Sequence, residues 1–258
     1  MNKKQPAISV GCSDCRNAPA LAMDFSMAFQ PIVDISRKSI FGYEALVRGL
    51  NGEGAAAILG QVDETNRYRF DQACRVKAID VAARLGLEGM LSINFLPNAV
   101  YRAETCIRAT LEAAEEHNFP TERIIFEVTE GERVTDHAHL LNILTTYKEL
   151  GFLTAIDDFG AGYSGLNLLA EFQPNIIKLD MALTRNIDKD RVRRAIVFAI
   201  LAVCRELDIK VIAEGIESRE ECLTLAEQGV ELFQGYYFAK PQFETLPVVA
   251  QATWASVA

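Results

Sequence analysis

The sequence predicts an α/β protein of the TIM-like (β/α)8 barrel class, with its first strand antiparallel. Short β-rich runs alternate with stretches of helical composition, which is typical of parallel β-α-β units. The chain has 258 residues, enough for about eight strands in one barrel. Only "SRK" separates the first two strands, too short for a crossover helix, so an antiparallel hairpin is expected there. An open, doubly wound sheet is the alternative.

The predicted elements follow one another in a regular order. The strands are the short β-rich runs at residues 27–35, 39–49, 90–96, 123–129, 152–159, 175–180, 209–215 and 230–238. The main helices between them are residues 66–86, 103–118, 134–151, 190–208 and 218–229. Several of these helices close on Gly or Asn, as helix C-termini tend to do. The alternation therefore runs through most of the chain.

Composition and charge argue against several classes of protein. Hydrophobic residues make up 50% of the chain and charged residues 24%, as in an ordinary globular protein. The net charge of −9 argues against a nucleic acid polymer as partner, because proteins that bind one normally carry a basic face. The longest apolar run, residues 195–204, falls short of the ~20 residues that a bilayer requires. We therefore expect no membrane insertion and a cytoplasmic location.

No linker rich in Gly, Ser or Pro divides the chain, so we expect one domain at residues 26–258 after an irregular segment at residues 1–25. That segment holds one C-x-x-C pair, Cys12 and Cys15. Arg16 follows where a haem-attachment motif needs His, and no second pair at suitable spacing completes a four-thiolate zinc site. A redox switch, a metal shared across a dimer and an ordinary mobile arm remain as alternatives.

Polar side chains recur at the C-terminal ends of the predicted strands. They are Glu44, Asn94, Glu127, Asp157 with Asp158, Lys178, Glu214 and Gln234. In an α/β barrel these ends converge on one mouth, where active sites are built. A single acidic residue at such a place is usually a helix cap or a solvated loop residue. The recurrence at the same end of successive strands is what indicates a site.

So many carboxylates at one mouth require protonation or neutralisation by cations. Oxygen ligands without His or Cys favour the hard cations Mg²⁺ or Mn²⁺, and the number of ligands fits two ions better than one. Two ions ~3.5–4 Å apart are a known device for in-line displacement at phosphorus. Lys178 would then orient the nucleophilic water or stabilise phosphate charge, and Arg48 would hold a phosphate oxygen.

These residues lie in an ordered series of motifs that resembles the EAL domain, the cyclic-di-GMP phosphodiesterase family named for its Glu-Ala-Leu signature. The signature here is "EALVR", from Glu44 to Arg48. The resemblance covers residues from about 27 to 245 and rests on "FQPIVD", "EALVR", "SINFLP", "FEVTE", "IDDFGAGYSGL", "IIKLD", "AEGIE" and "QGYYFAKP". One such match would be weak, whereas the ordered set is highly specific.

The resemblance implies a stand-alone EAL phosphodiesterase domain at residues 26–258. Such a domain cleaves one phosphodiester of cyclic di-GMP to give linear 5′-pGpG, which lowers this second messenger in bacterial signalling. It implies two metal ions, Mg²⁺ or Mn²⁺, one held by Glu44, Asn94, Glu127 and Asp157 and the other by Asp157, Asp158 and Glu214. Catalytic roles are expected for Lys178, which positions the hydrolytic water, and for Glu214.

The resemblance also implies substrate contacts, which are Gln30, Leu46, Arg48, Glu217, Gln234 and Pro241. Glu130 matches a glutamate that holds the loop after the paired aspartates and is counted with the catalytic residues. Asp71 is a weaker candidate for a contact. Family members commonly pair through that loop and the helix after Lys178, so we expect a homodimer.

The alternative function is a catalytically inactive EAL fold that acts as a cyclic-di-GMP receptor or as a regulator of another protein. Inactive members typically lose the EAL glutamate, one of the paired aspartates or the lysine. All of these residues are present here as Glu44, Asp157, Asp158 and Lys178. The sequence therefore favours the active enzyme.

Overall fold

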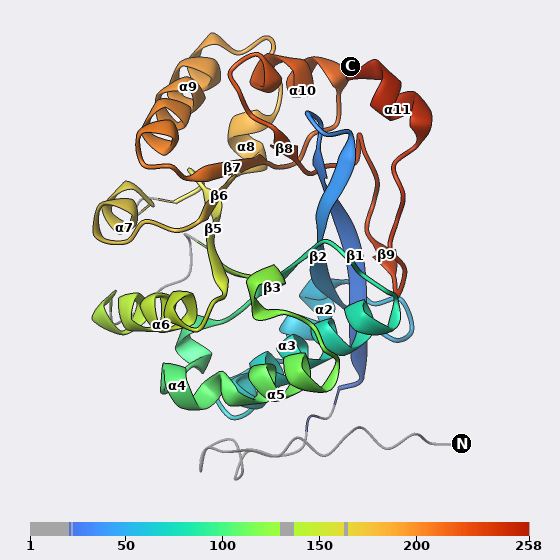
Figure 1. Ribbon diagram of the computed structural model, residues 1–258, viewed down its shortest axis with the longest axis vertical. Coiled ribbons are helices and arrows are strands. Elements are labelled where there is room, and N and C mark those ends of the chain that lie inside the picture. Colours follow the sequence, from blue (N-terminus) through green and yellow to red (C-terminus); the bar gives the residue numbers. More distant parts are fainter. Residues whose placement is uncertain (1–20, 22, 130–136, 163–164, 258) are drawn as a thin grey trace.

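The computed structural model of the chain describes residues 21, 23–129, 137–162 and 165–257, and it shows a ring of strands with helices outside it (Figure 1). The strands are β1 (Phe25–Asp34), β2 (Ser39–Gly49), β3 (Met90–Asn94), β4 (Ile124–Thr129), β5 (Leu153–Phe159), β6 (Ile176–Leu179), β7 (Lys210–Ala213) and β8 (Leu232–Phe233). From β2 to β8 they pair in chain order, each parallel to the next.

The first strand closes the ring. β1 pairs antiparallel with β2, from Phe25 opposite Gly49 to Asp34 opposite Ser39, and it also pairs antiparallel with β8. Residues 35–38 are the whole connection between β1 and β2, which leaves no room for a helix. The predicted barrel with an antiparallel first strand is confirmed, and the alternative of an open doubly wound sheet is wrong.

The last strand is much shorter than the predicted run at residues 230–238. The chain turns away at Gly235, where an added Cβ would lie only 2.1 Å from the carbonyl oxygen of Ile216, so glycine is required for this close approach. The chain then returns as β9 (Gln242–Phe243), which pairs antiparallel with β1 at Ala28 and Phe29. β9 was not predicted, because two paired residues carry no alternation in the sequence.

The five predicted helices are present in the structure, and their described ends differ from the prediction by a few residues, while residues 134–136 of the third lie outside the described residues. They are α3 (Arg67–Arg84), α4 (Ala103–Cys106) with α5 (Arg108–Glu116), α6 (His137–Glu149), α9 (Arg191–Glu206) and α10 (Arg219–Ala226). The predicted helix at residues 103–118 is thus divided at Ile107. Four short α-helices of the described residues were not predicted, namely α2 (Ala55–Leu59), α7 (Gly165–Glu171), α8 (Met181–Thr184) and α11 (Gln251–Ser256).

The interior of the barrel is built in two layers. An apolar layer consists of buried side chains from six strands, namely Ile32, Ile125, Ala155, Ile176, Ile212 and Leu232. Side chains two residues apart on a strand point to the same face. Two residues further toward the mouth, these six strands, or the residues directly after them, therefore present polar side chains, and β2 adds Glu44. The resulting polar layer consists of Gln30, Glu44, Glu127, Asp157, Lys178, Glu214 and Gln234.

Within the described ranges, none of the helices is long and apolar enough to cross a membrane. The cytoplasmic location expected from the sequence stays a prediction. The pair Cys12 and Cys15 lies outside the described residues. The domain boundary expected at residue 26 also stays a prediction.

Candidate active site

Lys178 is the centre of the polar layer. Its side chain is fully buried, and its Nζ atom lies within ion-pair distance of four carboxylates from four different strands or their ends. The distances are 2.8 Å to Glu214 Oε1, 2.9 Å to Glu127 Oε2, 3.0 Å to Asp157 Oδ1 and 3.5 Å to Glu44 Oε2. A single ammonium group therefore faces four acids.

Amide and hydroxyl donors fix the orientation of these carboxylates. Asn94 donates from Nδ2 to Glu44 Oε1 at 2.8 Å, and Gln234 donates from Nε2 to Glu44 Oε2 at 2.7 Å. Ser92, fully buried on β3, donates its hydroxyl to Glu127 Oε1. The buried Oε1 atom of Gln234 has no hydrogen-bond partner among the described residues, which leaves an acceptor at the mouth for a ligand.

The paired aspartates depend on an irregularity in β5. Strict alternation would send Asp157 and Asp158 to opposite faces of the strand. Between Ile156 and Phe159 the pairing with β6 shifts, and Asp158 has a φ of +53°. Aspartate adopts this left-handed conformation more readily than most residues. The irregularity thereby places both aspartates at the same site.

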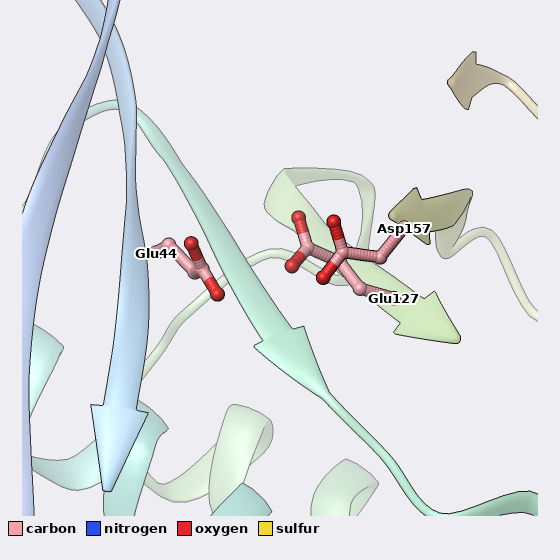
Figure 2. Close-up of side chains that lie close together, drawn as sticks. All are labelled: Glu44, Glu127 and Asp157. Atoms are coloured by element: carbon pink, nitrogen blue, oxygen red, sulfur yellow. The ribbon is translucent and has the colours of Figure 1, made fainter. Parts of the chain in front are cut away.

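Two overlapping groups of carboxylates result. Glu44, Glu127 and Asp157 each offer one oxygen within 4.8 Å of the others, and so do Asp157, Asp158 and Glu214. Figure 2 shows the first group, with side chains from β2, β4 and β5 directed into one interior space. Asp157 belongs to both groups, as the bridging role expected from the sequence requires.

Burial and mutual repulsion disturb the ionisation of this site. Burial raises the pKa of Glu127 to about 8, with the neighbouring carboxylates adding to the shift and Lys178 opposing it. Burial and the adjacent Asp157 raise the pKa of Asp158 to about 6. Burial likewise raises the pKa of Glu214 well above its ordinary value. Burial opposes the charged form of Lys178, but the surrounding carboxylates outweigh it and raise its pKa well above the usual range.

These residues fit divalent cations. The site offers only oxygen ligands, which hard cations such as Mg²⁺ and Mn²⁺ prefer. Four carboxylates surround the one ammonium group of Lys178, so the site holds more acidic groups than this cation balances. Asn94 uses its amide nitrogen as a donor to Glu44, so its oxygen is available for a cation.

Most of the expected substrate contacts line one pocket beside this cluster. The pocket has a volume of about 260 Å³, and its lining includes Gln30, Glu44, Leu46, Asp158, Glu214, Glu217 and Gln234. Arg48 and Pro241 are not part of this lining, although both are partly exposed. Arg48 donates to the carbonyl of Val47 at 2.7 Å. The sequence missed five further lining residues, which are Asp180, Met181, Gly215, Gly235 and Tyr236.

Glu217 has a partner that the sequence did not predict. Arg185 reaches it from the end of α8, with Nη1 2.7 Å from Glu217 Oε2 and Nη2 2.8 Å from Oε1. The neighbouring Glu221 is buried and accepts the backbone N–H groups of Asn186, Glu217 and Ser218. The expected contact Glu217 is therefore held in place before any ligand arrives.

The outcomes for two other expected residues differ. Glu130 lies outside the described residues, so its expected role stays a prediction. Asp71 is buried in α3 and paired with Arg75. Ser92 was missed, although it lies two residues before Asn94 and alternation alone places it on the same face of β3.

Comparison with known proteins shows which protein family the chain matches. A model described as "EAL domain" matches residues 14–241 of the chain. The Escherichia coli K12 protein named blue light- and temperature-regulated antirepressor BluF is 34% identical over 237 residues, which cover 92% of this chain and 58% of BluF. Cyclic di-GMP phosphodiesterase PdeR of the same organism is 38% identical over 151 residues, 58% of this chain and 22% of PdeR. The chain therefore spans less than two thirds of these curated relatives.

Solved structures are similar over most of the fold. A standalone versatile EAL protein from Vibrio cholerae O395, in a c-di-GMP bound form, is 60% identical with a TM-score of 0.88, covering 91% of this chain and 99% of that one. Klebsiella pneumoniae BlrP1, in a complex with manganese and cyclic di-GMP, is 34% identical with a TM-score of 0.81, covering 88% of this chain and 58% of that one.

Proposed function

Since this chain belongs to the EAL domain family, we propose that it hydrolyses cyclic di-GMP to linear 5′-pGpG with two divalent metal ions. The observation that carries the proposal is the cluster of four carboxylates around Lys178, with every residue of the expected metal site gathered at one mouth. Residues 26–258 would form this phosphodiesterase domain. The names of relatives such as PdeR support a phosphodiesterase, and the similar structures with bound cyclic di-GMP support the substrate.

One metal ion would be held by Glu44, Asn94, Glu127 and Asp157, and a second by Asp157, Asp158 and Glu214. When bound, two such ions supply Lewis-acid charge to the phosphate oxygens and to the attacking water. The complex of BlrP1 with manganese and cyclic di-GMP supports a divalent ion at this kind of site.

Lys178 would act as a donor and not as a base. The surrounding carboxylates raise its pKa, so its ammonium group keeps its protons at neutral pH. An ammonium group in this position donates hydrogen bonds to the attacking water or to a phosphate oxygen. Gln234 would offer its free Oε1 atom to a donor on the substrate.

The proposed reaction balances with water alone. Water adds to one phosphorus atom, the bond from that phosphorus to a ribose 3′ oxygen breaks, and the 3′ oxygen takes up a proton. The linear product therefore exceeds cyclic di-GMP by the mass of one water and carries a 5′ phosphate.

The test is product analysis by chromatography and mass spectrometry after incubating the purified chain with cyclic di-GMP and Mg²⁺ or Mn²⁺. We expect a linear dinucleotide, no product in EDTA and inhibition by Ca²⁺, whose looser coordination spoils an in-line geometry. Glu44→Gln should abolish the product. The matched change Glu231→Gln, at an exposed position that does not line the pocket, should leave the product unchanged. Full turnover in EDTA would overturn the two-metal proposal.

A second candidate function is favoured by the similarity to BluF, which is named an antirepressor. In that case the chain would bind cyclic di-GMP or another protein without hydrolysis. Tight binding of cyclic di-GMP with no linear product in either metal would support this function and reject the enzyme.

A homodimer is also proposed, with α9 as part of its interface. Val197 and Leu201 bury one face of α9 against the barrel. On the other face, Val192, Ile196 and Val203 are 67%, 45% and 39% exposed, spaced four and seven residues apart. An apolar stripe of this kind fits the same stripe on a second copy. Sedimentation should show a dimer that Ile196→Asp converts to a monomer, and a monomeric wild-type protein would remove the proposal.

A further inference from the structure

The largest fully buried side chain in the described part of the protein belongs to a charged residue, Arg75 of α3. Its Nη2 atom lies 2.6 Å from Asp71 Oδ2, and its Nη1 atom lies 3.3 Å from the hydroxyl of Tyr147 on α6. Asp71 is only 2% exposed. Burial opposes the charged guanidinium, yet the carboxylate beside it keeps the pKa of Arg75 above its ordinary value.

Stability alone does not explain a buried pair of this kind. Removing two charges from water costs about as much as their attraction returns, and apolar residues of similar volume are often as stable or more so. A buried ion pair therefore calls for a structural task that apolar residues cannot perform. The remaining contacts of Asp71 and Arg75 indicate what that task is.

The second carboxylate oxygen of Asp71 holds the chain just after β3. Asp71 Oδ1 accepts a hydrogen bond from the backbone N–H of Leu96 at 2.9 Å. The ring of Phe95 packs against Tyr147, with ring centroids 5.6 Å apart. The two residues that follow Asn94 are thus both held by one network, which links α3, α6 and the end of β3.

Asn94 is where this network meets the mouth of the barrel. Its Nδ2 atom donates to Glu44 at 2.8 Å, which leaves its side-chain oxygen for a cation. Because Asn94 is two residues from Leu96, a movement of the backbone at Leu96 would also displace the Asn94 side chain. Asp71 was a weaker candidate for a substrate contact, and the structure shows it buried, with a protein partner on each of its two oxygens. A different role follows from this bonding.

We propose that Asp71 and Arg75 are positioning residues, which lock the backbone after Asn94 so that the Asn94 oxygen is held toward a divalent cation. This inference rests on the metal site of the proposed function. Arg75 fixes the carboxylate of Asp71, and Asp71 fixes the amide of Leu96. In other metal sites, the loss of partners that orient the ligands weakens metal affinity or activity by about 10–100-fold.

Two double variants separate the hydrogen bond from the charges. Asp71→Leu with Arg75→Met removes both charges and the acceptor for the Leu96 N–H. Asp71→Asn with Arg75→Met removes both charges and keeps a carboxamide oxygen as acceptor. Mn²⁺ binding is measured by electron paramagnetic resonance without substrate, so that the readout does not depend on turnover. Ile79→Ala, a buried truncation in the same helix, is the control for lost stability.

We expect the Leu/Met variant to bind Mn²⁺ about tenfold more weakly, and the Asn/Met variant to stay within about threefold of the wild type. Ile79→Ala should unfold at a lower temperature with unchanged Mn²⁺ affinity. Wild-type affinity in both double variants, or an equal loss in both, would overturn the positioning role. A wild-type protein that does not bind Mn²⁺ would instead reject the metal site itself, which keeps the two failures distinct.

Asp71→Glu keeps the test available if the Leu/Met variant does not fold. It retains an ion pair with Arg75 but moves the carboxylate by one methylene group relative to Leu96. Mn²⁺ affinity should fall several-fold, and an unchanged affinity in this folded variant would overturn the proposal.

Discussion

Ile125 and Glu127 lie two residues apart on β4 and both point into the barrel, where they meet opposite surroundings. Ile125 packs against the other side chains of the apolar layer, among them Ile176 and Ile212. Glu127 meets Lys178 at 2.9 Å and shares that ammonium with three other carboxylates. The same strands, with the same alternation, thus build both layers.

The two layers differ in whether their side chains find all their partners within the chain. Every member of the apolar layer finds its partners within the chain, and its burial stabilises the fold. The polar layer carries more negative charge than its single ammonium group balances, so it is complete only with cations from outside. One layer serves the fold and the other serves a ligand. Substitutions should therefore separate stability from activity.

Asp157→Asn should give the largest effect on activity. It removes the carboxylate shared by both groups of ligands, so turnover of cyclic di-GMP should fall at least about a hundredfold. Without metal, the variant should unfold at the same or a higher temperature, because fewer carboxylates compete for Lys178. Steady-state kinetics and thermal unfolding in EDTA measure the two outcomes, and near wild-type turnover would show that Asp157 is not the bridging ligand.

Ile125→Ala should give the opposite result. Truncation of this fully buried side chain should cost about 2–5 kcal/mol of unfolding free energy, because a cavity remains in the apolar layer. Turnover per folded molecule should stay near the wild-type value. Denaturant unfolding and kinetics on the folded fraction test this. A parallel loss of turnover would mean that the two layers are not separable.

Ser92→Ala tests a residue that supports the polar layer from outside it. Ser92 is fully buried and donates its hydroxyl to Glu127, so its loss should weaken Mn²⁺ affinity about tenfold. Thr154→Val is the matched control, because it removes a buried hydroxyl from β5 whose partner is Asn175 and not a ligand residue. Calorimetric titration with Mn²⁺ compares the two, and equal affinities would place Ser92 with the structural residues.

The last prediction concerns pH. The pKa of Glu127 is raised from 4.5 to about 8 in the folded chain, so between these values the unfolded chain releases a proton that the folded chain keeps. The metal-free protein should therefore lose stability as pH rises through this window, and the loss should be absent below about pH 4.5. Melting temperatures in EDTA, compared with those of Glu127→Gln, isolate this contribution. An equal pH dependence in both proteins would contradict it.

The sequence predicted the barrel and the position of the polar layer because both follow from local alternation. Ile176 and Lys178, or Ile212 and Glu214, show the rule within a few residues. Contacts between distant segments could not be predicted in this way. Gln234 meets Glu44 across 190 residues of chain, and the pairing of Arg185 with Glu217 depends on how α8 lies against the segment that follows β7.

Departures from regular geometry were equally invisible in the sequence. Alternation cannot place Asp157 and Asp158 on one face, and the positive φ of Asp158 that does so depends on the shifted pairing of β5 with β6. The partner of Asp71 was also missed. Arg75 lies one helical turn away, and this spacing is typical of ordinary ion pairs on the surface of a helix. Only burial shows that this pair belongs to the interior.

The central claim is that cations from outside complete the polar layer, and a count of bound ions tests it most directly. Equilibrium dialysis against Mn²⁺ without substrate, followed by metal analysis, gives the number of ions per chain. We predict two ions for the wild type and for Ile125→Ala, and fewer for Asp157→Asn. No saturable Mn²⁺ in the wild type, or the same count in Asp157→Asn, would contradict the claim.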